Sequence, residues 1–354
     1  MLNQFFPFLL KKMIKKHILI DSVYINTGGG KEIINHIIEY IVDKDDVNKY
    51  FFLLDQRLEI KNKQIDFLQI NASEKNRRNF YSSNKNRFNS IVCMSNVPPP
   101  VKVDNASVSV YFHNDLLLNP IKSNVGFTTL LKNLIKKQYI KSKNKKNYSW
   151  IVQTKLMKIK LEKFLNIKNE KIKIFPIIDF QEYISPIKKK NKFVYVSNFS
   201  NHKNHFKLFK AFKDACREKS YDIELNLTID KKIYNKSFYY TSKKPKNLKI
   251  INHGIISTSQ VREIYNSSEF LIFPSLNESL GMPLIEAIFN GCKVLAPNLN
   301  YVGQVIIPSL TFDPYSVSSI SESIQYAVEN NIKNSEIIIE NKIDTFVKHI
   351  NNHV

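Results

Sequence analysis

Two glutamates eight residues apart, Glu278 and Glu286, have the setting in this chain that most suggests chemistry. They lie in the segment 274–287 (PSLNESLGMPLIEA), which follows a short apolar run. Pro283 favours the first position of a helix, so we expect a helix to begin there with Glu286 in its first turn. The N–H groups of such a loop and the positive end of the helix dipole can bind a phosphate. The two carboxylates could accept hydrogen bonds from the hydroxyl groups of the same ligand.

The two acids also have a simpler explanation that involves no ligand. An acid in the first turn stabilises a helix through its dipole, and a glutamate in a loop is ordinarily solvated. Spacing alone favours that explanation. The neighbours favour a ligand site instead, because Ser279, Gly281 and Pro283 occur in order between the two acids, behind an apolar strand.

The elements that must position this segment form two successive cycles of strands and helices. In the first cycle we expect a strand at 17–24, a loop at 25–30 and a helix at 31–42 whose isoleucines share one face. Apolar or β-branched runs predict further strands at 50–54, 65–70, 90–94 and 107–112. This alternation is typical of parallel strands joined by crossover helices.

A charged, proline-containing stretch at 184–191 indicates a linker, after which the second cycle begins. The patterns predict strands at 193–197, 223–229, 248–251, 270–273 and 293–296, and helices at 205–219, 259–267 and 283–290. Two last helices are expected at 318–330 and 335–351, without further strands. We therefore expect an α/β protein with two Rossmann-like doubly wound domains facing a cleft, at 1–184 and 185–334. Residues 335–354 form a C-terminal helix that could cross back to the first domain.

The order P-S-x-x-E-S-x-G-x-P-x-x-E-A at 274–287 resembles the two-glutamate segment of GT-B glycosyltransferases, specifically the retaining family 4 (glycosyl transferases group 1). The likeness extends to 193–212, which resembles the family's first strand and phosphate-clamp loop in that domain, and to 251–257, which resembles its base-contacting turn. Residues 301–305 resemble the segment after the next strand. In the first half the likeness is weaker and rests on Gly28, Gly29, Gly30, His113, Asn114, Gln153 and Thr154.

The resemblance implies roles for individual residues. Glu286 would bind ribose hydroxyls, Glu278 the hydroxyls of the donor sugar and Lys203 the diphosphate, and the catalytic residues would be Glu278, Lys203 and His113. The donor-binding positions would be Gly29, Gly30, Asn198, His202, Lys203, His253, Gly254, Glu278, Ser279, Leu280, Gly281, Met282, Pro283 and Glu286. The family commonly has Gly-Arg where this chain has Ser197 and Asn198. With one cation fewer in the loop, Lys203 and the helix dipole must supply more of the attraction for the diphosphate, or His202 helps to hold it.

The function implied is a retaining glycosyltransferase, a hexosyltransferase, that moves a sugar from a nucleotide-diphosphate sugar to a lipid-linked or saccharide acceptor. Its product would belong to a bacterial surface polysaccharide, namely O-antigen, capsule or lipopolysaccharide. No cofactor and no metal are expected, because the family needs no catalytic metal and the chain has no clustered cysteine or histidine ligands. Two alternatives stay open: a catalytically inactive GT-B module that binds sugar or a partner, and a basic nucleic-acid-binding protein, for which no nucleic-acid motif is found.

The net charge of the chain bears on its partners. The 354 residues include 53 Lys and Arg against 31 Asp and Glu, a formal charge of +22, and 43% are hydrophobic, which excludes intrinsic disorder. Basic residues recur from 122 to 192 among few acids, and with the apolar start of the chain they would suit an anionic membrane surface, although compositional bias explains them equally. The three scattered cysteines and the lack of a membrane-spanning run predict a cytoplasmic protein, or one peripheral on the inner face of the cytoplasmic membrane.

Overall fold

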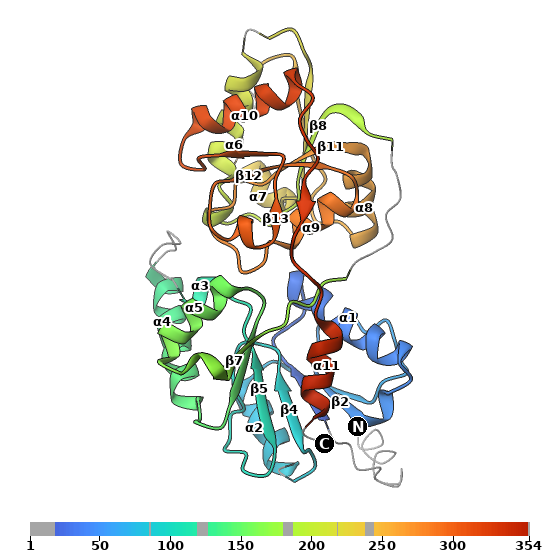
Figure 1. Cartoon of the computed structure of the whole chain (residues 1–354), viewed down its shortest axis with the longest axis vertical. Helices are drawn as coiled ribbons and strands as arrows, with labels where there is room; N and C mark the ends of the chain where they lie inside the picture. Colours follow the sequence, from blue (N-terminus) through green and yellow to red (C-terminus); the bar gives the residue numbers. More distant parts are fainter. Residues whose placement is uncertain are drawn as a thin grey trace. The chain divides into compact units, whose positions relative to one another are not determined.

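The computed structural model of the chain describes residues 18–84, 86–118, 127–179, 187–217, 219–237 and 244–352. The chain divides into two compact units, and Figure 1 shows a sheet with its helices in each. The first unit comprises residues 1–114, 135–179 and 341–354, and the second comprises residues 115–134 and 180–340.

The first unit contains a parallel sheet of seven strands in the order β3-β2-β1-β4-β5-β6-β7. Its strands are β1 (Ile18–Ser22), β2 (Tyr50–Asp55), β3 (Phe67–Ile70), β4 (Ser90–Cys93), β5 (Ser107–Tyr111), β6 (Ser149–Val152) and β7 (Ile172–Ile174). β1 pairs in parallel with β2 on one side and β4 on the other, with Ile18 opposite both Tyr50 and Ser90. The order of the strands reverses at β1, so the switch point where such sheets bind ligands lies between β1 and β4.

The helices that follow these strands along the chain are α1 (Gly28–Asp43), α2 (Glu74–Ser83), α3 (Asp115–Leu118), α4 (Phe127–Lys143) and α5 (Lys155–Leu165). The isoleucines of α1 recur with the helical period and are buried against β1 and β2. Phe346 and Ile350 of α11 (Ile343–Asn351) complete the same core, which explains why this last helix belongs to the first unit.

A buried arginine stabilises the carboxyl end of the first sheet. Arg77 of α2 is 1% exposed, and its guanidinium lies 2.8 Å from a carboxylate oxygen of Asp21 in β1. The same group donates to the carbonyl oxygen of Pro98 at 3.3 Å, and the Tyr81 hydroxyl donates to Asp21 at 2.8 Å. Arg77 therefore connects α2, β1 and the loop after β4, which carries three consecutive prolines.

The second unit contains a parallel sheet of six strands in the order β10-β9-β8-β11-β12-β14. Its strands are β8 (Lys189–Tyr195), β9 (Ile223–Leu227), β10 (Leu248–Asn252), β11 (Ser268–Ile272), β12 (Lys293–Pro297) and β14 (Leu310–Phe312). The switch point lies between β8 and β11, where Phe193 pairs with Phe270. Two short strands, β13 (Ile306–Ile307) and β15 (Glu336–Ile337), form a separate antiparallel pair.

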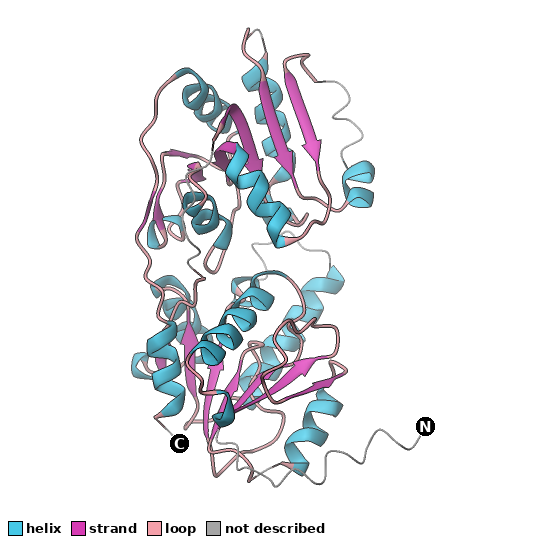
Figure 2. Ribbon diagram, turned by 90° about the vertical axis from the view of Figure 1, so that its right-hand side faces the viewer, coloured by secondary structure: helices cyan, strands magenta, loops and turns pink. Residues whose placement is uncertain are grey.

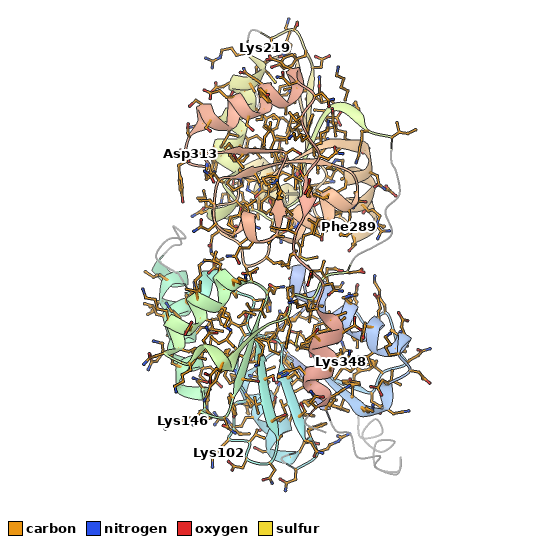
Figure 3. All side chains as sticks on the ribbon, in the orientation of Figure 1. Lys102, Lys146, Lys219, Phe289, Asp313 and Lys348 are labelled. Atoms are coloured by element: carbon orange, nitrogen blue, oxygen red, sulfur yellow. The ribbon has the colours of Figure 1, made fainter. Side chains whose placement is uncertain are left out.

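The helices that follow these strands along the chain are α6 (His205–Cys216), α7 (Lys231–Ser237), α8 (Thr258–Ser267), α9 (Met282–Phe289) and α10 (Val317–Glu329). The second unit also includes α3 and the first part of α4. Figure 2 shows the strands of each unit with helices packed beside them. In the core of the second unit, Phe193 stacks on Phe270 with ring centroids 4.8 Å apart and meets Phe212 of α6 edge-on. Charged side chains, among them Lys102 and Lys219, lie at the surface (Figure 3).

The predicted fold class, two Rossmann-like parallel-sheet units, is confirmed, and most predicted strands agree with the structure to within a few residues. Two predictions of elements are wrong. The triple glycine is not a loop but the start of α1, and the helix predicted at 335–351 is confined to α11. Strands β13, β14 and β15 also contradict the expected lack of further strands, because runs of two or three residues are too short to show periodicity. The predictions for residues 1–12 and 180–186 lie outside the described residues.

Replacing the buried arginine tests how much it contributes to the stability of the first unit. Arg77→Met leaves Asp21 buried without its countercharge, so we expect the free energy of unfolding to fall by about 3–5 kcal/mol. Lys102→Met is the matched control, because Lys102 and Asp104 form an ion pair with side chains that are 72% and 63% exposed. Its loss should cost less than about 1 kcal/mol. Urea denaturation of the two variants compares these effects, and equal losses would contradict a structural role for Arg77.

Candidate functional site

The loops after β8 and β11 meet at the switch point of the second sheet. Lys203 ends a short turn after β8, and Glu278 lies in the loop after β11. The Lys203 Nζ atom is 2.5 Å from Glu278 Oε1, and the two side chains are only 16% and 14% exposed. The structure thus brings together two residues that the sequence places 75 positions apart and that we predicted to act on one ligand.

The backbone around Lys203 is held from two sides. The Tyr195 hydroxyl at the end of β8 donates to the Lys203 carbonyl oxygen at 2.9 Å. The Leu276 N–H in the loop after β11 donates to the carbonyl oxygen of His202 at 2.7 Å. Asn204 follows in the left-handed conformation, with φ of 59°, and α6 begins directly after it. These contacts fix the direction in which the Lys203 side chain leaves the turn.

Glu278 is held by a serine that is fully buried. Ser275 Oγ donates to Glu278 Oε1 at 2.6 Å, and the Tyr301 hydroxyl donates to the Ser275 carbonyl oxygen at 2.7 Å. Sequence reasoning did not assign a role to Ser275 or to the Tyr301 hydroxyl. The signal was present in part, because Ser275 belongs to the P-S start of the segment and Tyr301 begins the stretch that resembles the family at 301–305.

Glu286 lies farther along α9 than predicted. The helix begins at Met282 with Pro283 as its second residue, so Glu286 is in the second turn rather than the first. Gly281 precedes the helix with φ of 78°, a conformation that favours glycine. The Tyr265 hydroxyl of α8 donates to Glu286 Oε2 at 3.3 Å. Tyr265 is 1% exposed, and Trp150 in the first unit is likewise buried.

The histidines of the loop after β8 do not add a positive charge at neutral pH. Burial and, secondarily, the nearby Lys203 ammonium lower the pKa of His202 below its ordinary value of 6.5. Burial lowers the pKa of His205 to about 3, and its Nε2 atom lies 3.0 Å from the hydroxyl of Ser197. A neutral His202 could help to hold a diphosphate only through a hydrogen bond, and Asn198 is exposed and uncharged, so the help expected from His202 stays a prediction.

The turn after β10 contains His253 and Gly254, which were predicted to contact the donor. His253 is half-buried, and its Nε2 atom lies 2.9 Å from Asn226 Oδ1 in β9. Gly254 has a φ of 81°, and a Cβ atom added to it would lie 3.0 Å from Cγ of Lys231. A larger residue at this position would be strained and would also displace the lysine side chain.

Ser279 and Leu280 lie in the loop before α9, where Leu280 is 2% exposed. Three other predicted residues, Gly29, Gly30 and His113, belong to the first unit. A Cβ atom on Gly30 would lie 3.5 Å from Cε1 of His113, whereas Gly29 faces open space. The His113 N–H donates to Asn96 Oδ1 at 2.7 Å, and burial lowers the pKa of its imidazole to about 4, so the ring is neutral at pH 7. Asn96, which the sequence did not single out, follows β4 with φ of 67°.

Gln153 and Thr154 have structural surroundings in the first unit. Thr154 is the N-cap of α5, where its hydroxyl accepts a hydrogen bond from the N–H of Met157 at 3.2 Å. Gln153 is 3% exposed at the end of β6. An N-cap hydrogen bond accounts for the threonine without any ligand.

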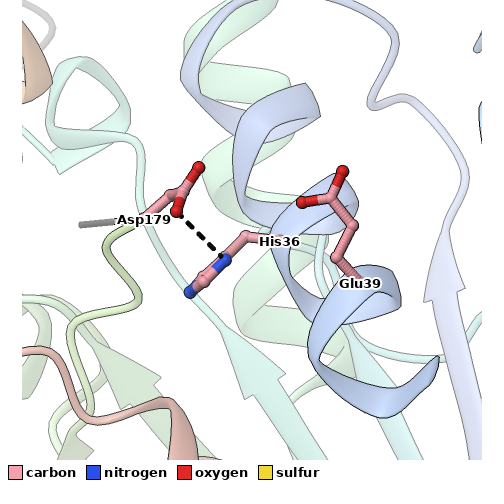
Figure 4. A group of neighbouring side chains, drawn as sticks. All are labelled: His36, Glu39 and Asp179. Carbon is pink, nitrogen blue, oxygen red and sulfur yellow. Dashed lines mark ion pairs between the residues drawn. The ribbon is translucent and has the colours of Figure 1, made fainter. Parts of the chain in front are cut away.

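One group of metal-ligand type occurs among the described residues, His36, Glu39 and Asp179 of the first unit (Figure 4). Its ligand atoms lie within 4.8 Å of one another, and His36 Nδ1 is 3.7 Å from Asp179 Oδ1. Glu39 and Asp179 are both exposed, and exposed acids near a histidine are common without an ion. The expectation that catalysis needs no metal stays a prediction.

Comparisons with known proteins agree with this arrangement. Residues 178–345 match the family model described as Glycosyl transferases group 1. No curated protein matches the sequence. The chain is similar to the solved structure of sucrose-phosphate synthase from Thermosynechococcus elongatus, with a TM-score of 0.70 and 14% identity over 89% of this chain and 90% of that one.

Two further solved structures have comparable similarity. One is WaaG, a glycosyltransferase involved in lipopolysaccharide biosynthesis, with a TM-score of 0.66 and 14% identity over 88% of this chain and 90% of that one. The other is HepE of Anabaena in complex with UDP and glucose, with a TM-score of 0.65 and 11% identity over 89% of this chain and 90% of that one. At such identities the likeness shows the fold, which is GT-B. Residues 178–345 thus match the model of the glycosyl transferases group 1 family, and the chain has the GT-B fold.

Proposed function

We propose that the protein is a retaining glycosyltransferase of family 4 that transfers a hexose from a nucleotide-diphosphate sugar. The observation that carries the proposal is the Lys203–Glu278 pair, which joins the two loops at the switch point inside the domain that matches the family model. An ammonium group beside a carboxylate is suited to a donor that has a diphosphate next to sugar hydroxyls. The complexes of HepE with UDP and with UDP-glucose are consistent with such a donor.

The chemistry follows from where charge develops. When the bond between the sugar and the diphosphate breaks, negative charge grows on the leaving diphosphate, and a fixed ammonium group stabilises it. Lys203 and the N–H groups before Pro283 at the start of α9 would supply this stabilisation. The acceptor hydroxyl attacks from the face that the diphosphate leaves, and its proton passes to the departing phosphate oxygen. No cofactor and no metal enter this proposal.

We propose a lipid-linked or saccharide acceptor in bacterial surface polysaccharide biosynthesis, which the similarity to WaaG supports. The competing function is a GT-B module that binds sugar without transferring it. The uncharged Ser197 and Asn198 in the clamp loop favour this alternative. Transfer of sugar to an acceptor by the purified protein distinguishes the two.

The two glutamates should have separate roles in donor binding. A nucleotide sugar at about 100 times its dissociation constant should stabilise the protein by about 2.7 kcal/mol, which a thermal shift detects. If Glu286 binds ribose, Glu286→Gln weakens binding of both the free nucleotide and the nucleotide sugar. Glu278→Gln should leave binding of the free nucleotide unchanged and reduce sugar transfer. Equal effects on the free nucleotide would contradict this division, and no shift with any nucleotide sugar would contradict the proposed function.

Lys203 should be required for turnover more than for folding. We expect Lys203→Ala to lower kcat by roughly 100-fold or more, which is the usual cost of losing one donor that stabilises a developing oxyanion. Lys210→Ala is the matched control, because Lys210 is an exposed lysine on the adjacent α6. Steady-state kinetics with saturating donor make the comparison. Activity of Lys203→Ala within a few-fold of the parent would show that the diphosphate is bound elsewhere.

We further propose that the protein acts at an anionic membrane surface, with α4 as its contact. Leu131, Leu134 and Ile135 recur at helical spacing on α4 and are 49%, 48% and 62% exposed. Lysines flank this apolar stripe, and α4 contains no acidic residue. None of the described helices is long and apolar enough to span a membrane. An apolar stripe with flanking lysines is the pattern of a helix that lies in the membrane interface.

Vesicle binding tests this surface. The protein should co-sediment with vesicles of phosphatidylglycerol and phosphatidylcholine more than with phosphatidylcholine alone. Replacing two flanking lysines, Lys132→Gln with Lys136→Gln, should weaken binding more than tenfold at about 1 kcal/mol per lysine. Ile135→Ser should also reduce it, whereas the control Ile307→Ser, at a site 52% exposed in the second unit, should not. Equal binding to neutral vesicles would contradict the proposal.

A further inference from the structure

Tyr24 has a backbone conformation that tyrosine rarely adopts. Its φ is 85°, in the left-handed region where the Cβ atom of any residue other than glycine is crowded. Apart from glycines, the other described residues with positive φ are one aspartate and four asparagines, which tolerate it. Tyr24 lies two residues after β1, in the loop that leads to the glycines at the start of α1. Strain of this kind persists where the surroundings enforce it, and it collects at functional sites.

Hydrogen bonds hold the backbone on both sides of Tyr24. The Ile25 N–H donates to the Ser22 carbonyl oxygen at 3.0 Å, which closes a tight turn. The Ser95 hydroxyl, in the loop after β4, donates to the Val23 carbonyl oxygen. These bonds fix the neighbours of Tyr24, but none of them involves its side chain.

The side chain of Tyr24 is bound to α2. Its hydroxyl donates to Glu74 Oε1 at 2.7 Å, and the Arg77 guanidinium donates to the same oxygen at 2.8 Å. The guanidinium carbon of Arg77 also lies 5.8 Å from the centroid of the Tyr24 ring. Burial and the bond to Glu74 raise the pKa of Tyr24, so its hydroxyl keeps its hydrogen and is the donor. Tyr24 is thus attached to the buried arginine that stabilises this edge of the sheet.

Glu74 is suited to hold the hydroxyl because it is charged and held from several sides. Burial would raise its pKa, but the charge of Arg77 and hydrogen bonds from Tyr139 and Tyr24 outweigh burial and lower the pKa. The carboxylate is therefore ionised at neutral pH and can only accept. Its other oxygen, Oε2, accepts from the Tyr139 hydroxyl of α4 at 2.5 Å. The two oxygens of Glu74 thus receive one tyrosine hydroxyl each.

The turn at Tyr24 determines how closely the chain approaches the start of α1. Ile25, the next residue, is 6% exposed, and a Cβ atom added to Gly30 would lie 3.2 Å from its Cγ2 atom. A change of φ at Tyr24 would move Ile25, which lies directly against Gly30. The position of the first turn of α1 therefore depends on the conformation of Tyr24.

We propose that Tyr24 is a positioning residue whose hydroxyl, held by Glu74, keeps this turn in its strained conformation and so sets the glycine-rich start of α1. The inference rests on the proposed function, for which Gly29 and Gly30 are predicted donor contacts. Glycine would adopt the same φ without strain, so the side chain rather than the backbone explains a tyrosine at this position. Without the hydroxyl bond the turn relaxes, and the donor must order it again on binding.

Hydrogen exchange on the full chain, measured by mass spectrometry at pH 7 without a ligand, tests whether the hydroxyl holds the turn. In Tyr24→Phe the segment 22–33 should exchange roughly tenfold faster than in the parent, because the turn opens locally. Tyr139→Phe is the matched control, since it removes the other tyrosine hydroxyl from Glu74, and it should change this exchange less than about twofold. Tyr24→Gly removes the strain together with the hydroxyl and should behave as Tyr24→Phe. Parent-like exchange in either Tyr24 variant, or equal effects of Tyr24→Phe and Tyr139→Phe, would overturn the proposal.

Kinetics with UDP-glucose as the probe test the effect on the site. A loosened turn binds the donor less well, so Tyr24→Phe should raise KM for the release of UDP about fivefold or more and leave kcat within about threefold of the parent. A purely structural role would lower the amount of folded enzyme, and hence the apparent kcat, without changing KM. Thermal denaturation verifies that the variants are folded.

The two measurements separate this role from the function on which it rests. No turnover of UDP-glucose by the parent would count against the proposed function, whereas exchange of the segment 22–33 needs no donor and would still decide whether Tyr24 holds the turn. Turnover by the parent, with an unchanged KM in Tyr24→Phe, would leave the proposed function intact and overturn the positioning role.

Discussion

The reversal of strand order at β8 is the constraint on which the candidate site depends. Chain connections leave β8 in one direction across the sheet and β11 in the other, so the loops after these two strands meet at an edge that no crossover helix covers. The long loop before α6 and the long loop before α9 both begin there. Lys203 and Glu278 can pair only because their loops leave adjacent strands, and that adjacency is a property of the whole sheet.

Much of this arrangement could be predicted from particular residues. The apolar runs that form β8 and β11 are long enough to be recognised, and the order of Glu278, Gly281, Pro283 and Glu286 indicates a loop that leads into a helix. Tyr265 is buried in the core, and its bond to Glu286 could not be predicted, because a tyrosine can be buried in a core and still donate its hydroxyl.

The parts that could not be predicted depend on the surroundings of a residue. Helix α2 was missed because its sequence is polar, and only the fold shows that Arg77 is buried beside Phe80 and Tyr81. The neutral state of His202 and His205 likewise follows from burial, which the sequence does not display. The contact of Ser275 with Glu278 joins residues three positions apart, yet it depends on the exact path of a loop without periodic structure.

These neutral side chains change how the clamp loop can hold an anion. Ser197, Asn198 and His202 offer hydrogen bonds without net charge at neutral pH, so in the proposed function the attraction for a diphosphate would come from Lys203 and from backbone dipoles. Lys203 itself is paired with Glu278, whose negative charge offsets part of its own. A ligand that places hydroxyl groups at Glu278 and phosphate oxygens at Lys203 would satisfy both residues at once, whereas a diphosphate without a sugar would leave Glu278 without hydroxyl partners. The pairing therefore favours ligands that contain both a diphosphate and a sugar over ligands that contain only one of these groups.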